Sequence, residues 1–555
     1  MVARTSVRSE KHRSATQKQN RVASPVGGLN FVNNTMDFPN IDAYILDNAF
    51  PRPYGCEIRK GFQNWIPSAD RFPDQVKSVL TFASAKKADS DIFASYAQNP
   101  SILYDVTTQN AAPVVSLTPS SNSDNPGEWY HTQFVTEGGN FMLAVSGGAG
   151  YYSYTVTTGV GAWTEHVDGT SAGEIEWPTL DTNTSKDIVF IWTWKSRVWF
   201  LVRDSAVAYY LPINQLSGKL EAFDFGQQLN LGGALLWASN WTYDSGAGID
   251  DSLVLASTEG QILVYEGTDP AVAANFKLKG RWFAGRFPVG RRNFCEHGGS
   301  VLFICEYGLQ SISDLVSGRL HTSNLSGTVG WKINPRLAGL VSENIDLEYW
   351  ALVPYPTEEY LVLLTPLIDT TTGLKQQFVM NSLTNAWGTF SGLNMKSADV
   401  FYGKFIAGTD DGLINQDFVG YEDGVSSDGT VKGDIVTARI QGAFDDYGSP
   451  IMNKRMLRIK VYGLANAQPT FFARFLAEYN LTTPIDAPTP KQSIYPLWDD
   501  AIWDENIWAE GDGSFHQWFG LSGFGKKVSL QLAIRGAGRV VYTDHETLYE
   551  QGIGL

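Results

Sequence analysis

Three tryptophans recur every five residues near the C-terminal end of the chain, with carboxylates between them. The run comprises Trp498, Trp503 and Trp508 with Asp499, Asp500, Asp504 and Glu505. Aromatic rings that stack on sugars beside hydrogen-bonding carboxylates could bind a glycan, and a correctly spaced carboxylate pair could cleave one. The alternative, which we favour, is an aromatic ladder that packs a loop onto the protein or onto a neighbouring subunit.

A second cluster combines arginines with aromatic residues in the segment RWFAGRFPVGRR, residues 281–292. Its Arg286, Arg291 and Arg292 could face DNA, because nucleic-acid sites combine basic and aromatic side chains. The segment could instead connect two structural repeats, with its arginines paired to acidic groups of an adjacent subunit. We expect the second arrangement, in which the loop lies at an interface or beside a channel.

Recognisable catalytic motifs are missing from the sequence. It contains no G-x-S-x-G elbow, no G-x-x-x-x-G-K-[ST] phosphate loop, no H-E-x-x-H and no EF-hand loop. Cys295, Glu296, His297 and Cys305 resemble metal ligands, but the two cysteines flank an apolar strand whose burial explains them better. We therefore predict no catalytic residue, no metal, no cofactor and no enzyme activity.

Composition narrows the class of protein further. The 555-residue chain has a formal net charge of -16, which argues against general adhesion to nucleic acid. Its three cysteines cannot form a disulfide framework, as expected for folding in a reducing cytoplasm. Because no apolar stretch approaches the roughly 18 residues of a membrane helix, we predict no membrane span.

The first 26 residues are basic in an otherwise acidic chain. Arg4, Arg8, Lys11 and Arg13 lie among Ser, Thr and Gln, with almost no large apolar residue. Such a segment cannot bury a core of its own. We expect an extended arm that binds an acidic neighbour during assembly; a disordered tail and an arm on nucleic acid are the alternatives.

A strand-rich unit returns about every 40 to 50 residues between Val79 and Tyr421, and such repeats are typical of propeller blades. The copy at 189–211 has three apolar runs joined by polar turns, which predicts three antiparallel strands. Similar units lie at 91–106, 141–156, 252–267, 300–315, 359–390 and 399–417. We predict six or seven irregular blades, with a pair of β-sandwiches as the alternative. Helical spacing is prominent only at 76–87.

The predicted fold class is all-β, an irregular β-propeller with a C-terminal β-sandwich and a basic extended N-terminal arm. The sandwich follows from alternating apolar and polar residues in the last part of the chain. The predicted parts are the arm at 1–26, an extended segment with the first strands at 27–75, the propeller at 76–421, an acidic Gly-rich linker at 422–434 and the sandwich at 435–555.

The extended segment carries the pattern D-A-x-x-L-D-N-x-F-P-R-x-x-G-x-x-x-R-x-G. The matching residues are Asp42, Ala43, Leu46, Asp47, Asn48, Phe50, Pro51, Arg52, Gly55, Arg59 and Gly61. The pattern resembles the start of virion proteins of short-tailed bacteriophages, and the closing sequence YTDHETLYEQGIGL looks like the same family. The order of parts is similar to that of the podoviral tail nozzle, or tail tubular protein B, class.

The resemblance implies a structural protein of the virion tail, made in the host bacterial cytoplasm and assembled as a homo-hexameric ring. The ring would bind a tail adaptor above it and tail fibres or a needle, and phage DNA would pass through its channel without sequence-specific binding. The basic arm and the patterned segment would hold subunits to each other or to the adaptor. The assembly residues expected in that segment are Asp47, Asn48, Phe50, Pro51, Arg52, Gly55 and Arg59. The alternatives are a tail glycan-binding or glycan-cleaving propeller and a monomeric scaffold propeller.

Overall fold

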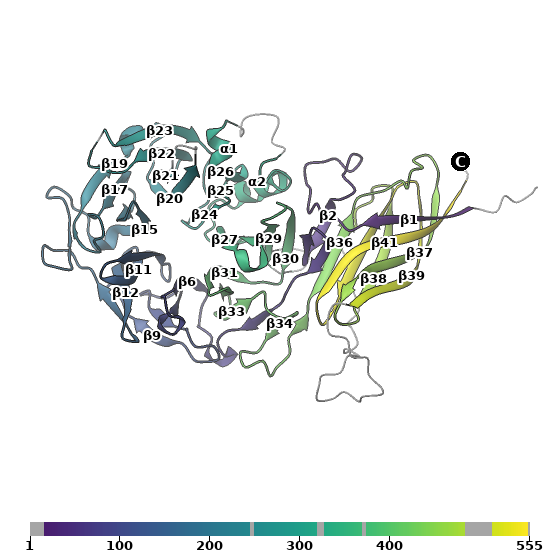
Figure 1. Ribbon diagram of the computed structural model, residues 1–555, viewed down its shortest axis with the longest axis horizontal. Helices are drawn as coiled ribbons and strands as arrows, with labels where there is room; N and C mark the ends of the chain where they lie inside the picture. The colour runs from purple at the N-terminus through teal and green to yellow at the C-terminus, as the bar shows by residue number, and fades with distance from the viewer. Residues whose placement is uncertain are drawn as a thin grey trace, which may run out of the picture. The chain divides into compact units, whose positions relative to one another are not determined.

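The computed structural model describes residues 16–244, 249–272, 274–318, 327–368, 373, 375–482, 485 and 513–552. The chain forms two compact units (Figure 1). The propeller unit comprises Leu29–Val32 and Arg59–Val436, and the sandwich unit comprises Met1–Gly28, Asn33–Ile58 and Thr437–Leu555. The segment that carries the D-A-x-x-L-D-N-x-F-P-R pattern therefore belongs partly to each unit.

The propeller unit is a closed ring of small, mostly antiparallel sheets. Within the described residues seven sheets surround one axis, and Figure 1 shows them around a common centre. Their innermost strands are β6 (Val76–Phe82), β10 (Tyr130–Thr136), β15 (Ile188–Trp194), β20 (Leu235–Asp244), β24 (Phe294–His297), β27 (Ala351–Tyr355) and β31 (Met395–Phe401). Each innermost strand contacts the next, and β31 contacts β6, which closes the ring. The predicted β-propeller is confirmed, with seven blades.

The outer strands complete each of the first six blades in chain order. Blade 1 adds β7 (Asp91–Tyr96), β8 (Leu103–Asp105) and β9 (Val114–Leu117), and blade 2 adds β11 (Gly139–Ser146), β12 (Gly150–Thr157) and β13 (Val160–Glu165). Blade 3 adds β16 (Arg197–Val202), β17 (Val207–Tyr210) and β19 (Glu221–Asp224), and blade 4 adds β21 (Ile249–Ser257), β22 (Gln261–Gly267) and β23 (Phe276–Phe283). Blade 5 adds β25 (Ser300–Cys305) and β26 (Gly308–Ser311), and blade 6 adds β28 (Tyr360–Leu364), β29 (Gln376–Asn381) and β30 (Trp387–Ser391).

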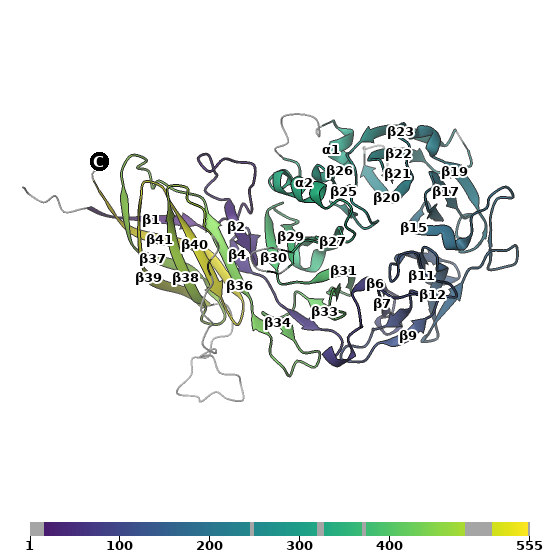
Figure 2. The same ribbon diagram turned by 180° about the vertical axis from the view of Figure 1, so that it is seen from behind.

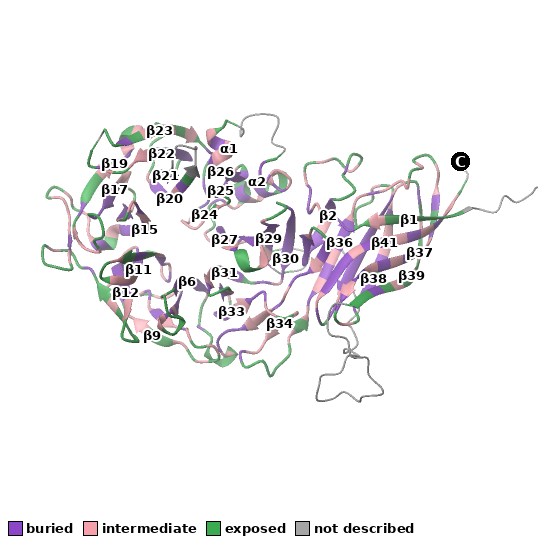
Figure 3. Cartoon of the chain, in the orientation of Figure 1, coloured by how far each residue is buried: buried purple, intermediate pink, exposed green. Residues whose placement is uncertain are grey.

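Blade 3 shows why these sequences form blades. Strands β15, β16 and β17 pair antiparallel over the segment where three strands were predicted. Trp199 lies opposite Trp192 on one side and Tyr210 on the other, and the two indole rings stack with centroids 5.5 Å apart. Aromatic cross-strand pairs of this kind stabilise a sheet and fill the space between blades. Among the innermost strands, β6 and β15 are mostly buried (Figure 3).

The last blade closes the ring with a strand from the beginning of the unit. β32 (Lys404–Thr409) and β33 (Ile414–Asp417) follow β31, and β5 (Phe62–Asn64) pairs antiparallel with β33. β34 (Glu422–Val425) then pairs with β5, and β35 (Asp434–Ile435) pairs with β34. The segment 422–434 was predicted as a linker, but strands occupy both its ends, because β34 pairs with the edge of β5 and β35 pairs with the edge of β34.

Two local predictions differ from the structure. The segment 76–87, which shows helical spacing, contains the strand β6, and all seven of its residues are buried. Because β6 is buried on both faces, including at Lys77, Ser78 and Thr81, its sequence lacks the alternation of apolar and polar residues that identifies a strand. The helix α2 (Asn334–Glu343) was not predicted, nor was the short helix α1 (Ile312–Val316).

The sandwich unit is built from two sheets, which Figure 2 shows from behind. One contains β3 (Ala49–Arg52), β4 (Gly55–Ile58), β41 (Val540–Gln551), β37 (Lys454–Ala465) and β39 (Gly513–Gly525), with β1 (Thr16–Ala23) beside β41. The other contains β2 (Ala43–Asp47), β36 (Thr437–Gly442), β40 (Val528–Arg535) and β38 (Thr470–Ala477). Met456, Val528 and Tyr549 pack together between the sheets. The predicted C-terminal sandwich is confirmed.

The described part of the basic arm forms the strand β1. Thr16–Ala23 pairs antiparallel with β41, and Arg21 Nε lies 2.7 Å from Asp544 Oδ1. From residue 16 onward the arm is thus a strand of the sandwich. Arg4, Arg8, Lys11 and Arg13 lie outside the described residues.

Candidate functional site at the propeller axis

Two cavities lie along the axis of the propeller. The first, which we call the outer cavity, has a volume of about 460 Å³. It is lined by residues at the beginnings of innermost strands or in the loops before them, including Glu128, Val189, Leu236, Arg291 and Glu348. The ring of blades thus gathers side chains from distant parts of the sequence around one space.

The second, inner cavity has a volume of about 330 Å³ and is lined by residues further along the same strands, such as His131, Phe190 and Asp399. Tyr130 and Arg291 line both cavities. His131 Nε2 lies 3.2 Å from Asp399 Oδ2, so an ion pair can form between blades 2 and 7 at the inner cavity when the imidazole is protonated.

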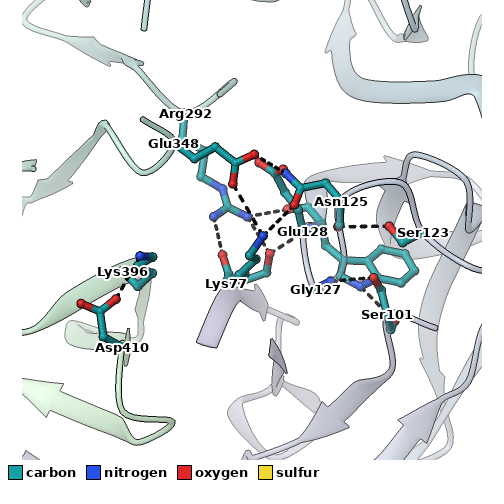
Figure 4. Close-up of polar contacts among 12 residues, drawn as sticks. Lys77, Ser101, Ser123, Asn125, Gly127, Glu128, Arg292, Glu348, Lys396 and Asp410 are labelled. Carbon is teal, nitrogen blue, oxygen red and sulfur yellow. Dashed lines mark hydrogen bonds and ion pairs between the residues drawn. The ribbon is translucent and has the colours of Figure 1, made fainter. Parts of the chain in front are cut away.

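Arg292 crosses the axis and joins three blades. It precedes β24 of blade 5, and its Nη1 donates to the carbonyl oxygen of Lys77 at 2.8 Å. Its Nη2 donates to Ser78 Oγ at 2.8 Å and to the carbonyl oxygen of Trp129 at 2.6 Å (Figure 4). Lys77 and Ser78 belong to blade 1, and Trp129 precedes the inner strand of blade 2. This one side chain therefore closes the axis with charge-assisted hydrogen bonds.

A polar network on the outer-cavity side joins blades 1, 2 and 6. Lys77 Nζ donates to Asn125 Oδ1 at 2.7 Å and lies 3.6 Å from Glu348 Oε2. The Asn125 side-chain amide donates to Glu348 Oε1 at 2.8 Å and also to Glu128 (Figure 4). Asn125 thus holds the carboxylates of Glu128 and Glu348 near the Lys77 ammonium group, whose positive charge reduces the repulsion between them.

A second charged group lies beside this network. Lys396 Nζ is 3.1 Å from Asp410 Oδ1 and 3.5 Å from the centroid of the Tyr349 ring. Lys375, which is 4% exposed, also pairs with Asp410, and burial lowers the pKa of its ammonium group. Cation–π and ion-pair contacts therefore connect the segment before β27 with blade 7.

Burial sets the protonation state of the phenol shared by the two cavities. Tyr130 donates a hydrogen bond to Glu128, and the pKa of Tyr130 is raised well above its ordinary value, first by burial and then by the Glu128 charge. Burial also lowers the pKa of the Arg291 guanidinium. A neutral phenol can thus donate to the carboxylate throughout the physiological range.

The arrangement is suited to binding and to holding blades together. The outer cavity lies within the roughly 300–1,000 Å³ range of small-ligand sites. Five carboxylates and three guanidinium groups line it. Since Arg292 crosses the axis, the propeller itself is not an open conduit.

The predicted arginine loop is a connection between blades, and the expected pairing of its arginines with an adjacent subunit stays a prediction. It joins β23 of blade 4 to β24 of blade 5. Arg291 donates to the carbonyl oxygens of Leu235 and Leu236, and Arg292 crosses the axis. Arg286 lies 3.4 Å from Glu306 and its side chain is 57% exposed. Of the three arginines, Arg286 is the most available to a partner.

The predicted assembly residues in the patterned segment make contacts within their own chain. In the sandwich unit, Asp47 pairs with Arg439 at 3.3 Å, and Asn48 Nδ2 donates to the carbonyl oxygen of Thr437 at 3.1 Å. Asn48 has a φ of 54°, a conformation that asparagine tolerates better than most residues.

The following residues form the hairpin β3–β4. Phe50 and Pro51 are buried in β3, and the Arg52 guanidinium lies over the Phe50 ring while its Nε donates to Glu57 at 3.1 Å. A Cβ at Gly55 would lie 2.6 Å from the carbonyl oxygen of Tyr542, so only glycine fits. These contacts give the pattern a role in folding, and its predicted role in assembly stays a prediction.

Arg59 is the patterned residue that belongs to the propeller. It is 1% exposed and binds both oxygens of Asp423, at 2.8 and 2.6 Å. It also donates to the carbonyl oxygen of Ser391 at 2.8 Å. Arg59 therefore fixes the chain immediately before β5, the strand that closes the ring.

Several residues of the axial site carry no signal in the sequence. Lys77, Asn125, Glu348 and Lys396 are isolated polar residues in unrelated local sequences. What they share is their place at the beginning of an innermost strand or in the loop before it. An alignment of the repeats in register would have been needed to find them. Trp498, Trp503 and Trp508 lie outside the described residues.

The described residues contain neither a membrane-spanning helix nor a cluster of metal ligands. No helix there is long and apolar enough to cross a membrane. Across the same residues, no group of three or more His, Cys, Asp or Glu side chains could hold a metal ion. Cys56, Cys295 and Cys305 are buried free thiols, and burial raises the pKa of Cys305 to about 12.

Comparisons with known proteins add likenesses of fold. No protein-family model and no curated protein matches the chain. Among solved structures, the computationally designed Ika8 protein matches with a TM-score of 0.33 and 11% identity, over 64% of this chain and 100% of that chain. Sqt1 of Saccharomyces cerevisiae matches with a TM-score of 0.36 and 12% identity, over 65% and 99%. BBS1N, solved in complex with ARL6DN, matches with a TM-score of 0.37 and 10% identity, over 65% and 98%. At these TM-scores the likenesses support no conclusion about function.

Proposed function

We propose that the protein is a structural, non-enzymatic component of a short phage tail, which forms a homo-hexameric nozzle ring below the tail adaptor and bounds the channel for genome ejection. The observation that carries the proposal is the patterned segment at residues 42–61. It resembles the opening of such virion proteins, and it supplies β2, β3 and β4 to the sandwich unit and Arg59 to the closure of the propeller.

The closed axis supports a ring in which the channel lies between subunits. A DNA duplex, whose major groove alone is about 12 Å wide, cannot pass an axis that Arg292 crosses. A conduit for DNA must then be bounded by several copies of the chain. Tail fibres or a needle would dock on the outside of that ring.

The charge of the chain also agrees with a conduit. Tight binding of DNA needs clustered Lys and Arg that neutralise phosphates. A net charge of -16 disfavours such binding, so a duplex could slide without being held.

Imaging of the purified full-length protein by negative-stain electron microscopy, with light-scattering mass over a range of concentrations, tests the proposal. Rings of six subunits with a central hole are the expected result. Monomers at every concentration, both alone and with a tail adaptor as template, would contradict the ring and favour a monomeric scaffold.

A glycan-binding or glycan-cleaving tail protein is the second candidate, and the outer cavity is the observation that favours it. Its volume and its carboxylates Glu128 and Glu348 suit a polar ligand of a few sugar units. Host polysaccharide should then raise the melting temperature, and Glu348→Gln should remove the increase. No increase across a broad polysaccharide panel would exclude this candidate.

A further inference from the structure

The outer cavity has an excess of negative charge. Its lining contains the carboxylates Asp124, Glu128, Glu259, Asp346 and Glu348 and the guanidinium groups Arg203, Arg286 and Arg291. The net charge that a ligand would meet depends on which of these groups already have a partner of opposite charge within the propeller.

The three arginines are all committed to partners within the chain. Arg203 forms an ion pair with Asp124, and Arg286 Nε lies 3.4 Å from Glu306 Oε2. Arg291 donates to two backbone carbonyl oxygens of the β20 strand. The guanidinium groups of the cavity lining therefore already have partners within the chain before any ligand binds.

Two of the carboxylates are not committed in this way. Glu259 and Asp346 are exposed, and among the described residues neither forms an ion pair. Glu348 keeps 31% of its side chain exposed despite its contact with Lys77. The charge that the cavity offers to a ligand is negative and comes from blades 4 and 6.

The rest of the wall suits long basic side chains. Phe287, Val289 and Ile345 line the cavity beside the carboxylates, and Val289 is 46% exposed. Lysine and arginine bury their aliphatic stems along apolar surface and keep the charged group beside an acid. An extended peptide with spaced basic residues matches this combination.

We propose that the basic N-terminal segment 1–15 of a neighbouring copy of this chain binds in the outer cavity, with its arginines and lysine against Glu259, Asp346 and Glu348. The segment supplies Arg4, Arg8, Lys11 and Arg13 against a single acidic residue, Glu10. The inference extends the assembly role proposed for the arm and rests on that role, and it does not depend on a ring of six.

The experiment uses a fluorescent peptide of residues 1–15 and full-length protein. The acceptor protein carries Arg4→Gln, Arg8→Gln, Lys11→Gln and Arg13→Gln, so that its own arm does not compete. Fluorescence anisotropy at low salt should show micromolar binding that weakens as salt is added, because ion pairs at an exposed site are screened. A peptide with the same four substitutions should not bind.

Charge reversal locates the site. Glu259→Lys with Asp346→Lys in the acceptor should weaken peptide binding at least about tenfold, equivalent to about 1.4 kcal/mol. The matched control is Glu137→Lys with Glu221→Lys, two exposed carboxylates of the same unit outside the cavity lining, which should leave binding unchanged. If the double reversal does not fold, Asp346→Asn alone should weaken binding by a smaller factor.

Three results would overturn the proposal. These are no peptide binding at low salt, equal affinity of the cavity and control variants, or binding of the peptide to duplex DNA with none to the protein. Failure to form rings in the microscope, with peptide binding intact, would refute the nozzle and leave this inference standing.

Discussion

Two arginines hold the propeller together in different ways. Arg292 lies on the axis and donates to the oxygens of Lys77, Ser78 and Trp129, so its acceptors are all neutral. Arg59 lies where the ring closes, is 1% exposed, and binds both oxygens of the Asp423 carboxylate. Arg292 lines a cavity that can admit water, whereas Arg59 is fully buried in blade 7.

The difference shows that burial decides whether the guanidinium needs a counter-charge. A buried charge without a partner costs several kcal/mol, so Arg59 requires Asp423. A half-buried one beside a polar cavity can keep water, so carbonyl and hydroxyl acceptors suffice for Arg292. The closure of the ring should therefore depend on charge and pH, whereas the axis should depend on hydrogen-bond geometry.

Replacing Arg59 should give the largest loss of stability. Arg59→Met leaves Asp423 without its cation and the carbonyl oxygen of Ser391 without a donor, which should lower the free energy of unfolding of the propeller by about 3–5 kcal/mol. Urea denaturation followed by tryptophan fluorescence measures it. Arg71→Ala, an exposed arginine of the same unit, serves as the control and should change stability by less than about 0.5 kcal/mol. Equal losses in the two variants would contradict the role of Arg59.

The second prediction concerns pH and the buried carboxyl of Asp417, in β33. Burial raises the pKa of Asp417 to about 8, the Arg59 charge opposes the shift, and the Asp423 charge adds to it. The folded protein thus holds this proton more tightly than the unfolded chain. The contribution to stability is present below about pH 4 and is lost as the pH rises toward about 8.

Asp417→Asn should make the free energy of unfolding less dependent on pH in that window. Between pH 5 and pH 7 the free energy of unfolding should change by about 2–3 kcal/mol less in the variant than in the wild type, since a difference of one bound proton corresponds to about 1.4 kcal/mol per pH unit. Urea denaturation at pH 5, 6 and 7 measures it, with the exposed Asp434→Asn as the control. Parallel curves for wild type and Asp417→Asn would show that this carboxyl is already ionised in the fold.

Arg292→Met should have a smaller effect than Arg59→Met. Three hydrogen bonds are lost, but water from the cavities can satisfy the oxygens of Lys77 and Trp129, so we expect about 1.5–2 kcal/mol. This loss should not change with pH between 5 and 8, unlike that at the ring closure. Arg286→Met, in the same loop with a 57% exposed side chain, should cost less than about 0.5 kcal/mol. A loss that equals that of Arg59→Met would remove the distinction between the two regions.

The sequence predicted the part of the molecule that depends on regular patterns. The strands of blade 3 and of the sandwich follow from alternation and turn residues, and they are present as expected. The helical spacing at 76–87 misled because β6 is buried on both faces. The pairing of β5 with β33 joins residues about 350 positions apart, and no local pattern encodes such a partner.

The candidate site was predictable only in part. Arg291 and Arg292 stood out because two adjacent arginines follow an aromatic run. Lys77, Asn125 and Glu348 could not be found, because their chemistry exists only once the blades bring them together. The patterned segment was recognised, but its fixed conformation, as at Asn48 and Gly55, depends on backbone contacts that sequence spacing does not show.

The smallest expected effect comes from the network that surrounds Arg292. Glu348→Gln keeps the shape and one acceptor for the Asn125 amide but removes the charge that lies 3.6 Å from Lys77 Nζ. Because this carboxylate is 31% exposed, solvent screens the pair, and the loss should be at most about 0.5–1 kcal/mol. Denaturation at low and high salt separates charge from packing, with the exposed Glu343→Gln as the control. If the deficit persists unchanged at high salt, the hydrogen bond from Asn125 rather than the ion pair stabilises this side of the axis, and the axis then depends on geometry alone.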